Sequence, residues 1–282
     1  MSEINGGKVT NLVVSEVDYT ISITELPDKI ANVDSTATND HALAFGNGAE
    51  AAGNSSAAFG VNTISEGMAS HAEGYKTCAK GIASHAEGGA NDATIGNEDK
   101  TKDGIKYMEY GSCAEGNYSH AEGSKTWAKG TASHAEGNLT YASGLSSHAE
   151  GYKTESLGEY SHAEGKESVA SGNNSHAEGI NTKAEGNYSH VEGNSTISKG
   201  ESSHAEGTNT QALSNNSHAE GENTKAEGVR SHAEGNSTIA TGVSSHAEGN
   251  ETKASGFASH AEGHSTQALG ICSHAEGGGD KN

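Results

Sequence analysis

A fourteen-residue repeat constrains the fold of this chain more than any other feature. The pentapeptide Ser-His-Ala-Glu-Gly recurs with its histidines 14 residues apart from His120 to His274, without one slip. Earlier copies at His71 and His85 are followed by a 35-residue gap, which is one period plus 21 residues. Two degenerate periods come first, and the segments in register are Ala44-Phe45-Gly46, Ala58-Phe59-Gly60 and Ala72-Glu73-Gly74. Such an array can bury small side chains layer by layer without a central core.

A full period, for example SHAEGNLTYASGLS from Ser133, contains two short alternating segments, S-H-A-E and T-x-A-x. Alternation places Ser, both Ala and Thr on one face, and His, Glu and the variable residues on the other. We expect Gly to supply the positive φ needed to turn between the two segments. Stacking such coils about 4.8 Å apart predicts an all-β parallel β-roll, or solenoid, of about sixteen coils and roughly 75 to 80 Å. No apolar stripe of period 3.6 supports a helical alternative.

Where the inward residues depart from the repeat, nearly all of the replacements are also small. Ser156 and Ser198 replace the second Ala, and Ser168 replaces Thr. Val191 is the one enlargement on the small face. The predicted interior therefore accepts only small side chains along the whole array.

Composition excludes several classes of protein. Only 31% of the residues are hydrophobic, and the formal net charge of −21 argues against nucleic acid or an anionic membrane as partner. Cys78, Cys113 and Cys272 are too few and too scattered for a disulfide framework or a CxxC metal site. Neither a signal peptide nor an apolar run of transmembrane length is present, so we expect no membrane insertion and export only by lysis or within a larger particle.

Interior packing does not explain why the motif His and Glu are identical in all fourteen copies, because both point outward. The outward residues of the second segment vary freely: Trp127, Tyr141, Glu155, Val169, Lys183, Ile197 and Gln211. One hypothesis is a self-association seam, in which imidazole and carboxylate groups alternate between chains. The seam residues would be His71, Glu73, His85, Glu87, His120, Glu122, His134, Glu136, His148, Glu150, His162, Glu164, His176, Glu178, His190, Glu192, His204, Glu206, His218, Glu220, His232, Glu234, His246, Glu248, His260, Glu262, His274 and Glu276.

Two other hypotheses remain for the same residues. An H-x-E pair offers nitrogen and oxygen ligands to Zn²⁺ or Fe²⁺, and with one His per coil such a site would need three chains around an axis. The candidate ligands are His120, Glu122, His134, Glu136, His148 and Glu150. The third hypothesis is a solvated repeat kept identical by recent duplication. No cofactor other than such a metal ion is expected.

The repeat resembles the head repeats of trimeric autotransporter adhesins, the YadA-like heads. The resemblance rests on the stretch ALAFGNGAEAAGNSSAAFGVNT from Ala42 and on the fourteen-residue period, and covers about residues 42 to 278. It implies left-handed parallel β-rolls associated as homotrimers. In that family two aliphatic residues flank the Ala and face neighbouring chains; here His148 and Glu150 flank Ala149. The SHAEG version is also similar to repeats in phage tail or fibre proteins.

The remaining segments have a different texture. Residues 1–41, with strand-like runs at 8–15 and 17–26, are expected to form a cap or to dock on a particle or baseplate component, and the roll occupies 42–282. An insertion at about 90–111 reads as a hairpin with Asp103-Gly104 at its tip. The stretch GGGDKN at the end adds no cap to the last coil, which suggests a removed C-terminal chaperone domain. Candidate contacts to a host glycan or protein are Tyr107, Met108, Tyr110, Trp127 and Tyr141.

These features together predict a function that is structural and adhesive. We expect a homotrimeric fibre of a phage tail or similar virion component, because the chain lacks the signal peptide, stalk and membrane anchor of the autotransporters. The alternatives are a bacterial cell-surface adhesin head and a metal-binding structural roll. An enzyme is not expected, since His and Glu two apart on one strand do not form a nucleophile, base and orienting group.

Overall fold

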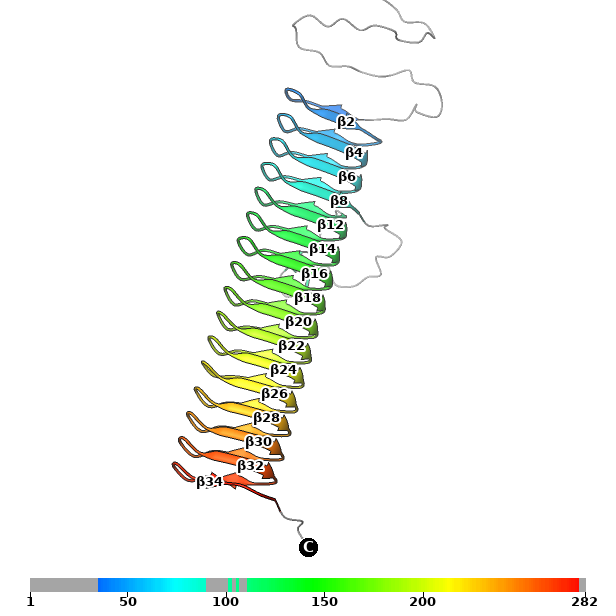
Figure 1. Ribbon diagram of the computed structural model, residues 1–282. Coiled ribbons are helices and arrows are strands. Elements are labelled where there is room, and N and C mark those ends of the chain that lie inside the picture. Colours follow the sequence, from blue (N-terminus) through cyan, green and yellow to red (C-terminus); the bar gives the residue numbers. More distant parts are fainter. Residues whose placement is uncertain (1–34, 90–100, 103–104, 107–110, 279–282) are drawn as a thin grey trace, which may run out of the picture.

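The chain folds into a straight stack of nearly identical coils (Figure 1). This computed structural model describes residues 35–89, 101–102, 105–106 and 111–278. Each coil contains one longer and one shorter strand, and the strands of successive coils pair in parallel to form two sheets of sixteen strands. The described residues contain no helix. The predicted all-β parallel β-solenoid of about sixteen fourteen-residue coils is therefore confirmed.

One sheet consists of the longer strands, which carry the SHAEG motif from the third coil onward. Its strands are β2 (Leu43–Phe45), β4 (Ala57–Val61), β6 (His71–Tyr75), β8 (His85–Gly88), β12 (His120–Ser124), β14 (His134–Asn138), β16 (His148–Tyr152), β18 (His162–Lys166), β20 (His176–Ile180), β22 (His190–Asn194), β24 (His204–Thr208), β26 (His218–Glu222), β28 (His232–Asn236), β30 (His246–Asn250), β32 (His260–His264) and β34 (His274–Ala275).

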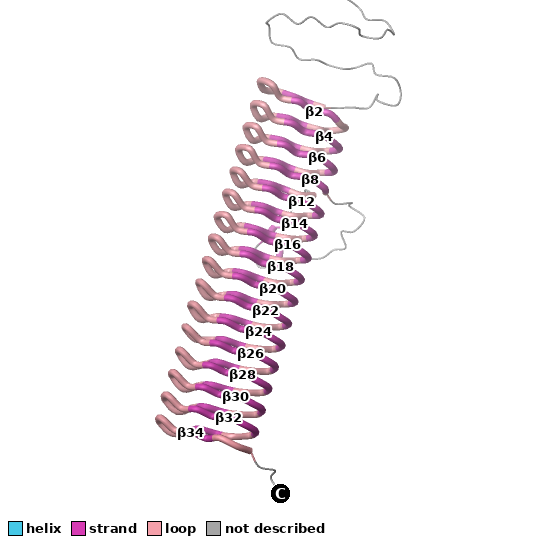
Figure 2. The backbone as a smooth tube through the Cα atoms, viewed as in Figure 1, coloured by secondary structure: helices cyan, strands magenta, loops and turns pink. Residues whose placement is uncertain are grey.

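The other sheet consists of two-residue strands that end on the second Ala of the repeat or on the Ser that replaces it. They are β1 (Thr36–Ala37), β3 (Glu50–Ala51), β5 (Ile64–Ser65), β7 (Cys78–Ala79), β11 (Cys113–Ala114), β13 (Trp127–Ala128), β15 (Tyr141–Ala142), β17 (Glu155–Ser156), β19 (Val169–Ala170), β21 (Lys183–Ala184), β23 (Ile197–Ser198), β25 (Gln211–Ala212), β27 (Lys225–Ala226), β29 (Ile239–Ala240), β31 (Lys253–Ala254) and β33 (Gln267–Ala268). Figure 2 shows how strands and turns repeat along the rod.

The register follows the repeat as predicted. Ala44 pairs with Ala58 and Phe45 with Phe59, so the two degenerate periods are ordinary coils of the stack. Across the insertion, His85 pairs with His120 just as His120 pairs with His134. The insertion itself contains β9 (Thr101–Lys102), which pairs antiparallel with β10 (Ile105–Lys106). It therefore leaves the corner of one coil without disturbing the pairing of the coils on either side.

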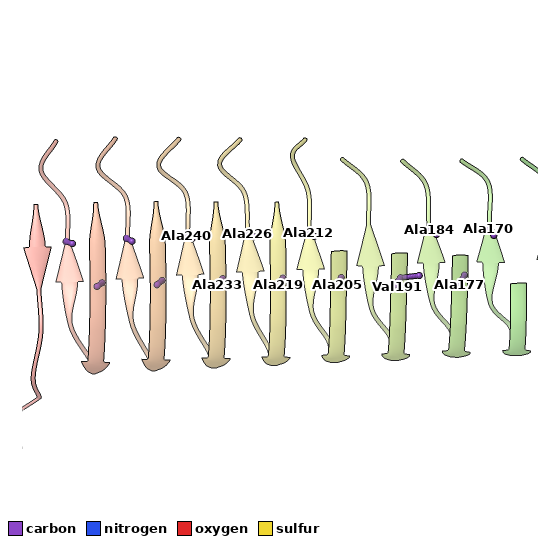
Figure 3. Close-up of a cluster of buried hydrophobic side chains, with 14 of the residues drawn as sticks. Ala170, Ala177, Ala184, Val191, Ala205, Ala212, Ala219, Ala226, Ala233 and Ala240 are labelled. Carbon is purple, nitrogen blue, oxygen red and sulfur yellow. The ribbon is translucent and has the colours of Figure 1, made fainter. Parts of the chain in front are cut away.

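The interior is made of small side chains only. The motif Ala and the second Ala form two rows that are completely buried, as shown for part of the roll in Figure 3. Most motif Ser hydroxyls donate to the carbonyl oxygen three residues earlier, for example Ser133 Oγ to Gly130 O at 2.7 Å. Other motif Ser hydroxyls have no hydrogen-bond partner among the described residues, namely those of Ser84, Ser147, Ser189 and Ser231. Val191 is the largest fully buried side chain. The predicted inward face of Ser, Ala and Thr is thus confirmed.

Serine replaces the second Ala where it gains a hydrogen bond. Ser156 Oγ lies 2.7 Å from Ser161 Oγ, and Ser198 Oγ lies 2.6 Å from Ser203 Oγ. Ser168, which replaces Thr, donates to Gly179 O at 3.0 Å. Each substitution is therefore matched to a buried acceptor, which satisfies its polar group.

The two glycines of each coil have different roles, and the predicted turn chemistry is only half right. The motif Gly adopts a positive φ, for example +111° at Gly137. The second Gly does not; instead, a Cβ on Gly130 would lie 1.9 Å from Gly144 O of the next coil. The left-handed corner positions are occupied by residues other than Gly, such as Ala132 at φ 55° and Leu139 at φ 59°. Close stacking of coils therefore requires the second Gly, and the turn does not.

Candidate functional site: the histidine and glutamate ladder

The motif His and Glu form two parallel columns along one face of the rod. Because β12 pairs with β14 residue for residue, His120 lies beside His134 and Glu122 beside Glu136. The same register repeats from β6 to β34. We call these two columns, from His71 to Glu276, the His/Glu ladder. The sequence-predicted seam residues therefore share one continuous surface.

The imidazole rings of the ladder stack on one another. Ring centroids of successive histidines are 4.6 to 4.9 Å apart. From His71 to His162 neighbouring rings are parallel within 5°. Farther along, the angle reaches 32° between His204 and His218 and 39° between His260 and His274. The spacing is that of parallel strands, so the backbone imposes it.

Within each strand the His and Glu side chains approach each other. The distance from His Nε2 to Glu Oε2 lies between 3.3 and 3.9 Å in thirteen coils. The remaining pair, His190 and Glu192, flanks the enlarged Val191. All of these distances exceed the 2.7 to 3.2 Å usual for a good hydrogen bond. In twelve histidines Nε2 is buried and has no hydrogen-bond partner, although each ring as a whole is only half-buried.

Burial and mutual repulsion keep four of the stacked rings neutral. The pKa of His148 is lowered from 6.5 to about 4, first by burial and then by the neighbouring rings of His134 and His162, while Glu136 opposes the shift. Burial is also the first cause that lowers the pKa of His176, His204 and His246. At neutral pH these four imidazoles therefore carry no charge, which removes the repulsion that a column of charged rings would suffer.

The same face is apolar in the first two coils. Leu43 and Phe45 occupy the positions that His and Glu take later, and they are 55% and 52% exposed. Phe59 lies in the Glu column, and its ring makes an edge contact with His71 at 5.6 Å. The ladder thus continues a face that begins with large exposed apolar side chains.

The ligand atoms for a metal site come together within one chain. His120, Glu122 and His134 place their ligand atoms within 4.8 Å of one another, and the next two coils repeat this arrangement. The expectation that a metal site needs three chains around an axis is therefore wrong, because adjacent coils of a single chain supply two imidazoles. The six predicted ligands, His120 to Glu150, all belong to these groups.

The predicted receptor contacts fall into two sets. Trp127 and Tyr141 lie on adjacent coils with their rings 5.2 Å apart, and the Lys129 ammonium lies 5.3 Å from the Trp127 ring centre. Tyr141 is only 8% exposed, so Trp127 supplies most of the accessible surface of this pair. Tyr107, Met108 and Tyr110 lie outside the described residues, as does the predicted N-terminal docking segment.

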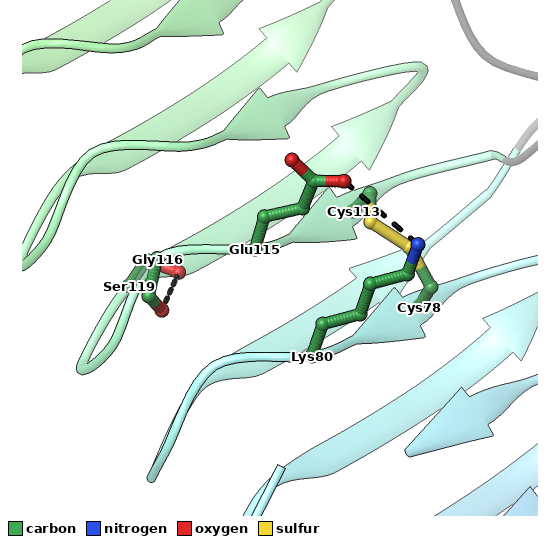
Figure 4. The surroundings of a disulfide bond; sticks show 6 residues. All are labelled: Cys78, Lys80, Cys113, Glu115, Gly116 and Ser119. Carbon is green, nitrogen blue, oxygen red and sulfur yellow. Dashed lines mark hydrogen bonds and ion pairs between the residues drawn. A yellow bond between two sulfur atoms is a disulfide. The ribbon is translucent and has the colours of Figure 1, made fainter. Parts of the chain in front are cut away.

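A disulfide between Cys78 and Cys113 is a feature that the sequence analysis missed. The two residues pair across β7 and β11 with a Cα–Cα distance of 4.6 Å, and both are buried. Beside the bond, Lys80 Nζ lies 3.8 Å from Glu115 Oε1 (Figure 4). Removing the 21 inserted residues from the 35-residue separation leaves one period, and this arithmetic was the available signal. The bond therefore joins the two coils that the insertion separates in sequence.

Comparisons with known proteins do not assign the chain to a family. Across the described ranges, no helix has the length and apolarity required to cross a bilayer. No model of a known protein family matches the chain, and a search of the curated proteins finds no match either.

Proposed function

We propose that the chain is a structural rod that assembles with copies of itself through the His/Glu ladder, as a homotrimeric fibre. The observation that carries this proposal is the identity of His and Glu at fourteen levels of one face, beside short strands whose outward residues vary. A surface that met only water would have no physical reason for this difference between the two sheets.

The period of the ladder favours a second copy as the partner. An object that makes the same contact with every coil must itself repeat at about 4.8 Å, the spacing of parallel strands. This chain has that repeat, together with His and Glu groups that can pair across an interface. Both columns remain partly exposed along the rod, so a second copy can reach the His and Glu side chains.

The first two coils also suggest that another chain covers the ladder face. Leu43 and Phe45 are large, apolar and exposed at the start of the ladder face, and contiguous exposed apolar surface marks interaction sites. A parallel arrangement of copies would bury these side chains together at one end and the ladder along the rest. The resemblance of the repeat to YadA-like heads, which implies trimers, is the reason for proposing three chains.

The proposed setting is a phage tail fibre or a similar extracellular particle. A long and uniform rod is suited to spacing, and the insertion and Trp127 are the candidate regions for contact with a host glycan or protein. Tail fibres made of the same repeat would carry such contacts in three copies. A bacterial cell-surface adhesin head is the alternative setting for the same assembly.

Sedimentation equilibrium of the purified chain, with and without EDTA, tests the assembly. A species three times the chain mass is expected in both conditions. The sharper comparison uses two triple variants in the same three coils. Replacing His218, His232 and His246 by Asn is expected to weaken the trimer at least tenfold, while replacing Lys225, Ile239 and Lys253 by Ala on the other sheet leaves it unchanged.

Two results would contradict the proposal. A monomer at all concentrations would remove the seam, and equal weakening by both triple variants would show that the ladder is not the contact face. Circular dichroism of each variant checks that the β-roll is retained.

A further inference from the structure

Four groups of side chains in the ladder have the composition of metal sites. They are His120, Glu122 and His134; His134, Glu136 and His148; His148, Glu150 and His162; and Glu164, His176 and Glu178. In each group the ligand atoms lie within 4.8 Å of one another. Each group joins two successive coils of one chain, so it exists without any partner chain.

The distances within each strand suit an ion better than a hydrogen bond. His120 Nε2 and Glu122 Oε2 are 3.9 Å apart, and the pairs at His134, His148 and His162 are 3.8 to 3.9 Å apart. Two ligands of a tetrahedral zinc ion, each about 2.1 Å from the metal, are separated by about 3.4 Å. Closing each pair by about half an ångström would therefore place an ion between nitrogen and oxygen.

The two imidazoles of a group must also turn toward each other. The rings of His120, His134, His148 and His162 are parallel within 5°, so their nitrogen lone pairs do not yet converge. Rotation about the last side-chain torsion of His is broad and inexpensive. The same ladder already holds rings tilted by 25° between His162 and His176, and by 29° between His246 and His260. The stack thus tolerates the movement that binding requires.

We propose that the ladder from His120 to His162 binds divalent transition-metal ions, with zinc the best fit, each held by two imidazoles and one carboxylate of adjacent coils. Neutral imidazole and carboxylate are the ligands that zinc takes from proteins, and a fourth position remains for water or a group from another molecule. His134 and His148 each belong to two groups, so neighbouring groups cannot be filled together. The first and third groups can be, which gives two ions per chain in this part of the ladder.

A zinc titration of the full chain, first dialysed against EDTA, tests the site. Calorimetry with zinc chloride gives the number of ions bound, and visible absorption after adding cobalt chloride reports a tetrahedral site. Replacing His134 and His148 by Asn removes a ligand from each of the three groups between His120 and His162, and is expected to abolish the two ions bound there and to weaken the cobalt band. The matched control replaces His232 and His246 by Asn, in coils outside the groups, and is expected to keep both ions.

A second variant tests whether zinc is lost because a ligand is removed or because the imidazole stack is disrupted. Replacing Glu122, Glu136 and Glu150 together by Gln removes the carboxylate of all three groups, keeps every ring and is expected to lower zinc affinity at least tenfold. The proposal is overturned if the EDTA-treated chain binds no zinc, or if the two histidine double variants lose zinc equally.

The same samples keep this inference separate from the proposed assembly. Sedimentation of zinc-loaded and zinc-free protein shows whether the chains associate. Zinc binding by a monomer would support the metal site and reject the trimer. A trimer that forms in EDTA and binds no zinc would support the trimer and reject the metal site.

Discussion

At the scale of single residues, contact between coils restricts the sequence more than local conformation does. Ala132 and Leu139 adopt the left-handed conformation that glycine usually supplies, at a cost of roughly 1 to 2 kcal/mol each. Gly130 has no positive φ, yet a Cβ there would overlap the next coil. A side chain can tolerate an unfavourable φ, but no rotation removes an overlap with backbone atoms. The close stacking of successive coils, and not the backbone conformation, therefore explains why the second Gly of the repeat is a glycine.

Alanine at Gly130 is expected to destabilise the roll by about 3 kcal/mol, because its Cβ would collide with Gly144 O. The matched control is Gly270→Ala in the last coil, where the nearest atom would be 3.6 Å away. Urea denaturation of both variants measures the difference. Equal stability of the two would contradict the role of stacking.

Serine at the same position is expected to cost less than alanine. Ser214 is a natural example, and its Oγ donates to Glu227 O in the next coil at 2.6 Å. In a Gly130→Ser variant the hydroxyl could donate to the corresponding Ser143 O, which offsets part of the overlap. Gly130→Ser should therefore unfold at higher urea than Gly130→Ala, and the reverse order would reject this explanation.

Most of the residue pattern was predictable, and the exceptions have identifiable physical reasons. Alternation alone placed the motif Ala and Thr inside, because burial on one face of a strand leaves few options. Sequence spacing could not show that Gly130 is needed for clearance, since that contact lies between coils. Nor could it show that ligand atoms of His120, Glu122 and His134 lie within 4.8 Å of one another in one chain, because outward side chains have no packing that fixes their direction. The Cys78–Cys113 bond was hidden by the insertion.

At the scale of elements, each strand is stabilised by pairing with nearly identical neighbours. The histidines of successive strands also interact electrostatically along the ladder. The four imidazoles with lowered pKa are neutral in the fold because of burial and of their stacked neighbours. Protonation of one ring in such a column raises the cost of protonating the next. Acid should therefore weaken the fold by protonating these four rings.

Acid is expected to lower the stability of the roll below about pH 6.5. The folded pKa of His246 is below the unfolded value, so the unfolded chain takes up the proton first and gains stability as pH falls. Burial is the first cause that lowers the pKa of His246, followed by the neighbouring rings of His232 and His260, while Glu248 and Glu234 oppose the shift. Thermal midpoints at about pH 7.5 and about pH 5.5 measure the effect. The variant with Asn at 218, 232 and 246 should show a smaller fall, and an identical fall would contradict the ladder as its origin.

The disulfide acts on the element that the insertion interrupts. Reduction, or Cys78→Ser, is expected to destabilise the described coils by up to about 4 kcal/mol, because the bond closes a loop of 35 residues. Urea denaturation with and without dithiothreitol measures this loss. Cys272→Ser is the control, since Cys272 is exposed and free, and it should change nothing. Indifference to the reductant would show that the bond does not contribute.

At the scale of the whole molecule, the rod is a sum of equivalent layers. Successive longer strands of the repeat pair in the same register from one end of the stack to the other. Stability of such arrays is close to a sum of the layers and the contacts between neighbours. Nothing in a given coil therefore depends on how many coils lie beyond its neighbours.

Deleting residues 217–244, which form two coils, is expected to leave a folded rod about 10 Å shorter. Small-angle scattering measures the length, and circular dichroism checks the β-structure. Deleting residues 217–231 is the control, because one residue more than a period would turn the buried side chains of the following strand outward. A folded protein from the second deletion would mean that register is not what holds the layers together.

The insertion shows that one corner between a longer and a shorter strand can host foreign sequence at no cost to pairing. β8 pairs with β12, and β7 with β11, as if the 21 residues were absent. Every coil has an equivalent corner, so a peptide or a small domain could be grafted at a chosen level. The position of such a graft along the rod could be chosen in steps of about 4.8 Å, the distance between successive coils. The roll would therefore serve as a scaffold that displays a peptide at a chosen distance from its end.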